Sequence, residues 1–178
     1  MRWLRITTAE ERRAYLAARN AAFPEAPWTA EGLAYFLQSP QWAVGTTCAA
    51  FDGERLVGSV LAYWDPHDTG PRRVGYTEEV FTLAPWRGRG IARYLLAHAL
   101  QYLHTHGVAE AHLQVRATNS GALGVYTGLG YRLGSETLHL TQEVRPGAAG
   151  CGSQLTPPAF TCILPFRNST DRDRRLEG

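Results

Sequence analysis

Apolar positions change their spacing several times along the chain, and each spacing predicts a different element. Two apolar runs, at 46–51 and 56–63, have the length of typical strands. The residues between them read Asp-Gly-Glu-Arg, and an Asp-Gly pair is typical of a tight hairpin turn. This pattern predicts an antiparallel pair of strands joined by residues 52–55.

A third strand, predicted at 74–83, leads through a glycine-containing turn into a helix. The turn, at 87–92, reads RGRGIA. Apolar residues recur at helical intervals from Gly90 as far as Gly107, and glycine is common at the end of a helix. The apolar residues of this amphipathic helix are Ile91, Leu95, Leu96, Ala99, Leu100 and Leu103.

Flanking segments complete an alternation of strands and helices. A hydroxyl cap at Thr7 and Thr8, followed by acidic residues, predicts a helix that ends near Asn20. A second helix is predicted to open at Thr29 and to end before Pro40. The order of elements after residue 74 predicts an α/β sandwich with some parallel pairing. The remaining predicted elements are a strand at 3–6, a strand at 111–115, a helix at 120–129 and closing strands at 131–133 and 137–141.

The periodic pattern breaks down after residue 145. From Pro146 onward glycine, proline and alanine dominate, and the last residues are charged without periodicity. A chain of 178 residues with 44% hydrophobic residues has room for one domain with a sizeable core. We therefore expect one domain over 1–145 and an irregular tail over 146–178, in which the apolar stretch 159–164 adds an edge strand or packs on a neighbour.

Charge and cysteine content exclude several classes of protein. Basic and acidic residues nearly balance, 18 against 16, so the net charge of +2 gives no case for a nucleic-acid or membrane partner. The cysteines, Cys48, Cys151 and Cys162, lack the spacing of a zinc site or a disulfide framework. No apolar run approaches the ~20 residues of a membrane span, and the first residues become charged before an export signal forms. We expect a cytoplasmic protein without a metal site.

The RGRGIA turn suits a phosphate group, and three phosphate-binding patterns compete for it. A strand, a glycine turn and a helix N-terminus together present backbone N–H groups at the positive end of the helix dipole. All 18 basic residues are arginine, so the lysine of a P-loop is missing. Arg93 stands where a dinucleotide fingerprint needs its last glycine. The third pattern is Arg or Gln, then Gly three residues later, then Gly or Ala two residues after that glycine. Arg87, Gly90 and Ala92 satisfy it.

The third pattern resembles the acetyl-CoA turn of the GNAT superfamily of N-acetyltransferases. A second motif supports the resemblance, because residues 119–131 are similar to the family's N-x-x-A-x-x-x-Y-x-x-x-G-F/Y segment. One predicted helix and one predicted strand separate the two motifs, and the resemblance covers residues 3–142. It implies a GNAT-like α/β fold, with a mixed, mostly antiparallel central sheet flanked by helices on both faces.

The resemblance also implies acetyl-CoA as the acetyl-donor cosubstrate, with no metal. Backbone amides of 88–93 would hold its pyrophosphate, with the glycines giving clearance, while the arginine side chains either add bonds to the phosphate or are merely solvated. Main-chain groups of the preceding strand would bind the pantetheine arm, and Asn119 would contact the cofactor or cap its helix. The implied cofactor-binding residues are Val80, Phe81, Thr82, Arg87, Gly88, Arg89, Gly90, Ile91, Ala92, Arg93, Asn119 and Tyr126.

Three residues are candidates for catalysis. Tyr126 matches the family's tyrosine near the CoA sulfur, where its phenol can donate a proton to the thiolate; the alternative is that it only packs its helix on the sheet. Gln114 stands where similar N-terminal acetyltransferases carry a glutamate, and glutamine cannot take a proton. Other branches of the family carry a glutamate at the position that is Tyr76 here, and Glu78, two residues on, lies on the same face of a regular strand. The resemblance therefore favours Glu78 as the general base, and the alternative is that the glutamates only mark an exposed strand end. Glu79 comes close behind, although it points to the other face unless a bulge intervenes.

These residues predict an acyltransferase that moves acetyl from acetyl-CoA to a primary amine of a small molecule, by direct attack in a ternary complex. Two alternatives stay open. One is a protein or peptide N-terminal acetyltransferase, against which the missing acid at Gln114 counts. The other is an acetyl-CoA-binding module without catalysis. We expect a monomer or homodimer. The resemblance implies that the first two helices, the loop between them and the last strands set acceptor specificity. Phe23, Trp28, Tyr35, Tyr63 and Trp64 are candidates to line the acceptor site, and the alternative is that each belongs to the ordinary core or surface.

Overall fold

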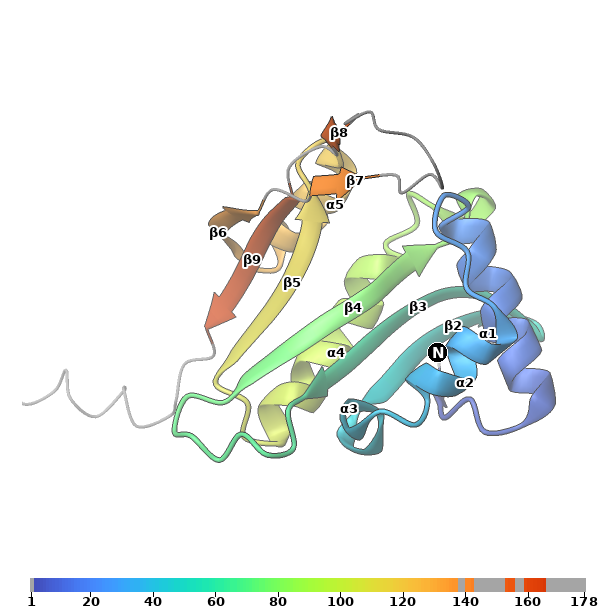
Figure 1. The fold of residues 1–178 in the computed structure, drawn as a ribbon, viewed down its shortest axis with the longest axis horizontal. Coiled ribbons are helices and arrows are strands. Elements are labelled where there is room, and N and C mark those ends of the chain that lie inside the picture. The colour runs from blue at the N-terminus through green and yellow to red at the C-terminus, as the bar shows by residue number, and fades with distance from the viewer. Residues whose placement is uncertain (1, 138–139, 143–152, 156–158, 166–178) are drawn as a thin grey trace, which may run out of the picture. The chain divides into compact units, whose positions relative to one another are not determined.

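The computed structural model describes residues 2–137, 140–142, 153–155 and 159–165 (Figure 1). Two compact units divide the chain, one built mainly on Met1–His112 and the other on Leu113–Leu164. The irregular character predicted for most of 146–178 falls on residues outside the described part, as does Cys151.

The first helix, α1 (Ala9–Ala22), begins where the sequence predicts it. The Thr8 hydroxyl accepts a hydrogen bond from the Glu11 amide at 3.1 Å, and the Glu11 carboxylate accepts one from the Thr8 amide at 3.0 Å. This reciprocal capping box satisfies two backbone donors that the helix itself cannot. The helix runs to Ala22, two residues beyond the predicted end.

The second predicted helix is confirmed as α2 (Ala30–Phe36), which ends before Pro40, and an additional short helix, α3 (Pro40–Val44), follows it. Thr29 caps α2, as expected, by accepting from the Gly32 amide at 3.0 Å. Pro40 occupies the first turn of α3, where its missing N–H costs nothing, and so it opens a helix rather than merely ending one.

Four strands form the antiparallel part of the first unit. The predicted hairpin is confirmed, with Asp52 paired to Arg55 at its tip and Gly53 at φ 57°. The strand predicted at 74–83 is also confirmed, and it pairs with the second strand of the hairpin. The bounds are β1 (Arg2–Leu4), β2 (Thr46–Asp52), β3 (Arg55–Trp64) and β4 (Val74–Thr82).

A βαβ crossover follows β4 along the chain. The amphipathic helix α4 (Ile91–Thr105) leads to β5 (Glu110–Arg116), which lies parallel to β4. The parallel pairing covers only three residue pairs and ends at Tyr76 opposite His112. The rest of β4, from Thr77 onward, therefore has no pairing to β5 along that edge.

Helices cover both faces of the first unit's sheet, as the sequence predicts (Figure 1). On one face α1 and α2 place Tyr15 and Leu33 in a core with Leu56 and Phe81. On the other face α4 buries its apolar stripe, and Trp64 packs on this side, with its ring 5.9 Å from that of Tyr102. Trp64 thus lies on the face opposite to α1, so it does not join the other predicted acceptor-lining residues.

The second unit holds the remaining elements. Their bounds are α5 (Ser120–Gly128), β6 (Arg132–Thr137), β7 (Leu140–Gln142), β8 (Ser153–Leu155) and β9 (Ala159–Pro165). The hydrogen-bonded strand order is β1-β2-β3-β4-β5-β9-β6, with β7 and β8 as a separate pair. The apolar stretch near 159–164 does form a strand, but the prediction of an edge strand is wrong, because β9 lies between β5 and β6. Among the described helices, none is long and apolar enough to cross a membrane.

Candidate active site

The turn between β4 and α4 is built on two glycines with left-handed backbone. Gly88 has φ 73° and Gly90 has φ 76°, a region that residues with a Cβ rarely adopt. A Cβ built at either position would have no atom within 4 Å. Open space therefore lies directly beside the backbone of this turn.

The same turn presents unused hydrogen-bond donors. Within the described residues, the N–H groups of Gly88 through Ala92 have no acceptor, and no side chain caps α4. The first intrahelical bond is that from the Tyr94 amide to the Gly90 carbonyl, at 3.0 Å. Free amides, clearance for close approach and the positive end of a helix of 15 residues together fit a pyrophosphate group.

The side chain of Arg87, the first residue of the turn motif, folds back on the end of β4. Its Nε donates to the carbonyl oxygen of Thr82, 3.0 Å away. This bond ties the end of β4 to the start of the turn. The Arg87 side chain thus has a structural partner, although Arg87 and Arg89 are both exposed.

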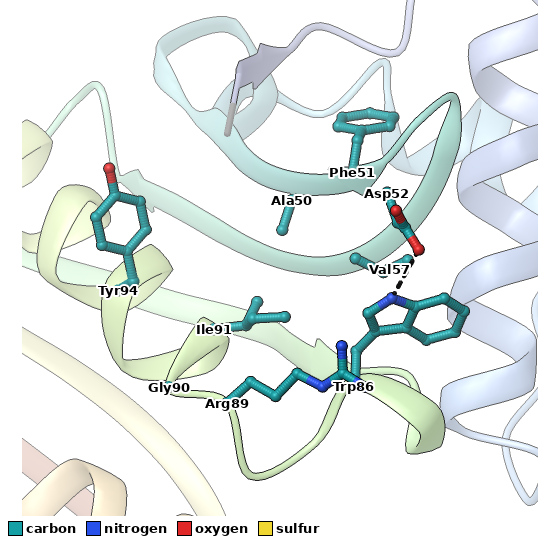
Figure 2. A pocket seen from close by; sticks show the side chains of 9 residues that line it. All are labelled: Ala50, Phe51, Asp52, Val57, Trp86, Arg89, Gly90, Ile91 and Tyr94. Carbon is teal, nitrogen blue, oxygen red and sulfur yellow. Dashed lines mark hydrogen bonds between the residues drawn. The ribbon is translucent and has the colours of Figure 1, made fainter.

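A hollow of about 540 Å³ lies beside the turn, on the side of the β2–β3 hairpin (Figure 2). Trp86 forms one wall, and its indole Nε1 donates to the Asp52 carboxylate at 3.1 Å. The Arg55 guanidinium lies over the same indole, 4.8 Å from the ring centroid. The hairpin therefore anchors the residue that precedes the glycine turn. The residues lining the hollow are Ala50, Phe51, Asp52, Val57, Trp86, Arg89, Gly90, Ile91 and Tyr94.

A bulge interrupts β4 at the two candidate glutamates. The register with β3 shifts between Ser59 and Leu61, and Glu79 takes φ 49°. In a regular strand Glu79 would share a face with Gly75, whose missing Cβ would lie 3.0 Å from Leu103 of α4. The bulge instead turns Glu79 toward α1, so the condition on which the prediction for Glu79 depended is met.

Glu79 is engaged in an ion pair with Arg19 of α1. The Arg19 Nε lies 2.8 Å from one carboxylate oxygen, and Nη2 lies 3.4 Å from the other. Arg19 is only 5% exposed, so this is a largely buried, two-pronged contact. A carboxylate held in this way is poorly suited to taking a proton from a substrate.

Glu78 has different surroundings. Its side chain keeps access to solvent, yet loss of hydration raises the pKa of its carboxyl above the usual range, and the negative charge of Glu79 adds to the rise. A hydrogen bond from the Tyr63 hydroxyl opposes this shift. Tyr63 in turn stacks on Tyr76, with ring centroids 5.4 Å apart. Glu78 thus has the accessibility and the raised pKa that a general base needs.

The stretch predicted to bind pantetheine, Val80 to Thr82, can contact a ligand mainly through its backbone groups. Phe81 is buried, and its ring lies 6.4 Å from Tyr15 and 6.0 Å from Phe23. Its side chain therefore belongs to the core on the α1 side. Backbone groups remain for a ligand along the edge of β4 that has no pairing to β5.

Asn119 directly precedes α5, and Tyr126 lies within this helix, in the second unit. Asn119 is the N-cap, and its Oδ1 accepts from the Ala122 amide at 3.1 Å. Tyr126 is 6% exposed, and burial raises its pKa to about 12. The phenol therefore stays protonated at neutral pH, which is the state that a proton donor requires.

Sequence reasoning missed Arg19. A signal for it exists, because Tyr15, Ala18 and Ala22 place the apolar stripe of α1 on the side where Arg19 also falls. A charge on such a stripe needs a buried partner. No group of His, Cys, Asp and Glu able to hold a metal ion occurs in the part of the chain that the structure describes.

A family model described as the acetyltransferase (GNAT) family matches residues 10–131 of this chain. The chain belongs to this GNAT family. It is 32% identical over 142 residues to a mycothiol acetyltransferase of Geodermatophilus obscurus, a match that covers 74% of this chain and 44% of that protein. It is 33% identical over 82 residues to the N-alpha-acetyltransferase MAK3 of Arabidopsis thaliana, covering 46% of this chain and 42% of that protein. The GNAT chain thus spans less than half the length of these two relatives.

Solved structures show the same fold. The NatC complex bound to Gag peptide and CoA contains a chain with a TM-score of 0.67 and 21% identity, covering 94% of this chain and all of that one. The ribosomal-protein-S18-alanine N-acetyltransferase from Escherichia coli gives a TM-score of 0.64 at 18% identity, covering 91% and 93% of the two chains. The GNAT fold predicted from the sequence is therefore confirmed.

Proposed function

We propose that this protein transfers an acetyl group from acetyl-CoA to a primary amine of a small molecule. The observation that carries the proposal is the β4–α4 turn, where two left-handed glycines open the backbone and the N–H groups of Gly88 through Ala92 are available to an anion. Membership of the GNAT family supports acetyl-CoA as the source of that anion.

Each step of the reaction has a candidate residue. Glu78 accepts the proton that the amine loses as its nitrogen bonds to the acetyl carbon. Tyr126 donates a proton to the thiolate sulfur as the carbon–sulfur bond breaks. The raised pKa of both groups supports these roles, since it keeps the Tyr126 phenol protonated and makes the Glu78 carboxylate a stronger base than usual.

Main-chain groups of Val80, Phe81 and Thr82 bind the pantetheine arm and the acetyl carbonyl in this proposal. The missing β5 pairing along this part of β4 supports it, because an unpaired strand edge can add hydrogen bonds to a ligand. Arg87 contributes through its bond to Thr82 rather than as a phosphate ligand. Arg89 is an exposed guanidinium of this turn and is suited to the cofactor phosphates, and Asn119 both caps α5 and contacts the cofactor.

The acceptor side supports an amine. Glu78 places a carboxylate beside the stacked rings of Tyr63 and Tyr76, and carboxylates and aromatic faces both attract ammonium groups. The second candidate is N-terminal acetylation of a peptide, which the similarity to an N-alpha-acetyltransferase favours. Gln114, which has no basic group, counts against it. A cytoplasmic location and a monomeric or homodimeric state stay predictions.

An acceptor screen separates these functions. Purified protein is given acetyl-CoA with aminoglycosides, polyamines, amino acids or N-terminal peptides, and free CoA thiol is followed. Calorimetry measures acetyl-CoA binding in parallel. Turnover with a small amine supports the proposal, and turnover with peptides alone supports the second candidate. Binding without turnover across the panel would indicate a binding module, and absence of binding would overturn all three.

A further inference from the structure

Arg19 holds the segment between α1 and α2 as well as the bulge of β4. We call residues 23–28 the acceptor loop, because the family resemblance implies that this segment borders the acceptor. The Arg19 Nη1 donates to the Ala26 carbonyl oxygen. The guanidinium also lies over two rings of the loop, 5.1 Å from the centroid of Phe23 and 4.2 Å from that of Trp28. One buried side chain therefore fixes the loop by its backbone and by its aromatic side chains.

Asn20, the next residue of α1, binds the C-terminal end of the acceptor loop. The Asn20 side chain donates to the Trp28 carbonyl and accepts from the Trp28 amide, each at 2.9 Å. Within the loop itself, the Ala26 amide donates to the Phe23 carbonyl at 3.1 Å. The last turns of α1 thus hold the acceptor loop by hydrogen bonds at Ala26 and at Trp28.

The other end of the contact is the bulged residue of β4. Glu79 has φ 49°, a backbone conformation that is unfavourable for any residue with a Cβ. Its carboxylate receives both prongs of the Arg19 guanidinium. The ion pair therefore stabilises the bulge, and the bulge sets where Glu78 and the following backbone of β4 point.

We propose that Arg19 and Glu79 are positioning residues that lock the acceptor loop to the bulge of β4. Through this pair, the loop that borders the acceptor and the strand that carries Glu78 form one preset unit. A buried ion pair adds little net stability compared with apolar packing, whereas its fixed geometry specifies one arrangement of the parts it joins. This inference rests on the proposed function, because it assigns the acceptor side of the same site.

Arg19→Lys tests the positioning role, because lysine keeps the charge but cannot form the two-pronged contact. The acceptor used is the panel amine that gives the highest turnover. We expect its KM to rise about tenfold, because the acceptor loop would be misplaced by a fraction of an ångström. The acetyl-CoA dissociation constant should change less than about threefold, because the glycine turn is untouched. Arg13→Lys, on an exposed position of the same helix, is the matched control and should change neither constant.

A double variant separates positioning from folding. Arg19→Met with Glu79→Gln leaves no unpaired buried charge, so its melting temperature should stay close to that of the unaltered protein. Its acceptor KM should still be raised, since neither the bulge nor the loop is held. Hydrogen exchange provides a readout that needs no acceptor. Backbone amides in 23–28 and in 77–82 should exchange faster together in both variants, and not in Arg13→Lys.

The outcomes are distinguishable. A raised acceptor KM with coupled exchange in the two segments supports the inference. Unchanged acceptor KM and unchanged exchange in folded Arg19→Lys would overturn it. A loss of kcat alone, with both constants intact, would indicate a smaller folded fraction and would also overturn the positioning role. If the unaltered protein binds no acetyl-CoA, the proposed function fails instead.

Discussion

Arg87 folds back on the strand that precedes it, and its Nε donates to the carbonyl oxygen of Thr82 at 3.0 Å. An arginine in a phosphate-binding motif is usually regarded as a phosphate ligand. Here the side chain instead holds the strand end against the turn. In the proposed function, recognition of the anion is therefore left mainly to the backbone N–H groups, which the conformation of Gly88 and Gly90 exposes.

This assignment predicts a specific effect of Gly90→Ala. A Cβ at φ 76° is strained, so we expect a loss of about 1 kcal/mol in the free energy of unfolding. We also expect acetyl-CoA affinity to fall about tenfold or more, the effect of weakening one hydrogen bond to a charged group. Thermal unfolding and calorimetric titration with acetyl-CoA measure the two effects.

Gly53→Ala is the matched control for this change. Gly53 also has positive φ, at 57°, but it lies in the β2–β3 hairpin turn and not among the free amides. Its substitution should cost similar stability and leave acetyl-CoA affinity unchanged. Equal loss of affinity in the two variants would mean that strain alone, and not the turn, controls binding.

The two adjacent glutamates should respond in opposite ways to substitution by glutamine. Glu79→Gln leaves Arg19 as a buried charge without its ionic partner, so we expect a loss of about 3 kcal/mol in the free energy of unfolding. Glu78→Gln should abolish most turnover but leave the melting temperature at pH 7 equal or slightly higher. Circular dichroism melts and CoA release, measured on both variants, check this contrast.

The sign of the Glu78 effect follows from its pKa. The pKa is raised in the folded chain, so the folded state holds this proton more tightly than the unfolded state does. Stability from this group is present below the usual pKa of glutamate and is lost as the pH rises through the raised value. Turnover shows the reverse dependence, because only the ionised carboxylate accepts a proton. A pH–rate profile of kcat whose acid limb persists in Glu78→Gln would exclude Glu78 as the base.

Tyr126→Phe should lower kcat about a hundredfold and leave acetyl-CoA affinity nearly unchanged, as expected for the loss of a general acid. Burial raises the pKa of this phenol to about 12, so its loss of function through ionisation should appear only in strongly alkaline solution. Tyr131→Phe, which removes a hydroxyl from a buried residue 6.0 Å away between ring centroids, is the control. Equal turnover in Tyr126→Phe and the unaltered protein would leave Tyr126 with packing alone.

Local sequence signals predict the elements of this fold well. The hairpin at Asp52–Arg55 and the helix that follows Gly90 each depend on neighbours a few residues apart, so turn chemistry and apolar spacing were enough to place them. The short helix that begins at Pro40 was missed, because a proline marks the end of one helix and the first turn of another equally well. The position of β9 inside the sheet depends on long-range pairing with β5 and β6, which no local pattern encodes.

Sequence provides candidate residues for the site but not their surroundings. The glycines of the turn follow from a motif, whereas the choice between Glu78 and Glu79 depends on a bulge that reverses the facing of the strand. Arg19 lies 60 residues before its partner Glu79, and only the packing of α1 on β4 brings the two charges together. Such contacts require the three-dimensional structure.

The hydrogen bond from Trp86 to Asp52 yields the last prediction. It joins the tip of the β2–β3 hairpin to the residue before Arg87, so the hairpin helps to preset the glycine turn (Figure 2). Asp52→Ala should therefore cost about 1 kcal/mol in stability, the net value of one such bond, and weaken acetyl-CoA binding severalfold. Asp52→Asn keeps an acceptor oxygen for the indole, and we expect it to retain most of the affinity. Glu54→Ala, at an exposed position of the same hairpin, should change neither quantity. An equal loss in Asp52→Asn and Asp52→Ala would show that the negative charge, and not the anchor on Trp86, matters for binding.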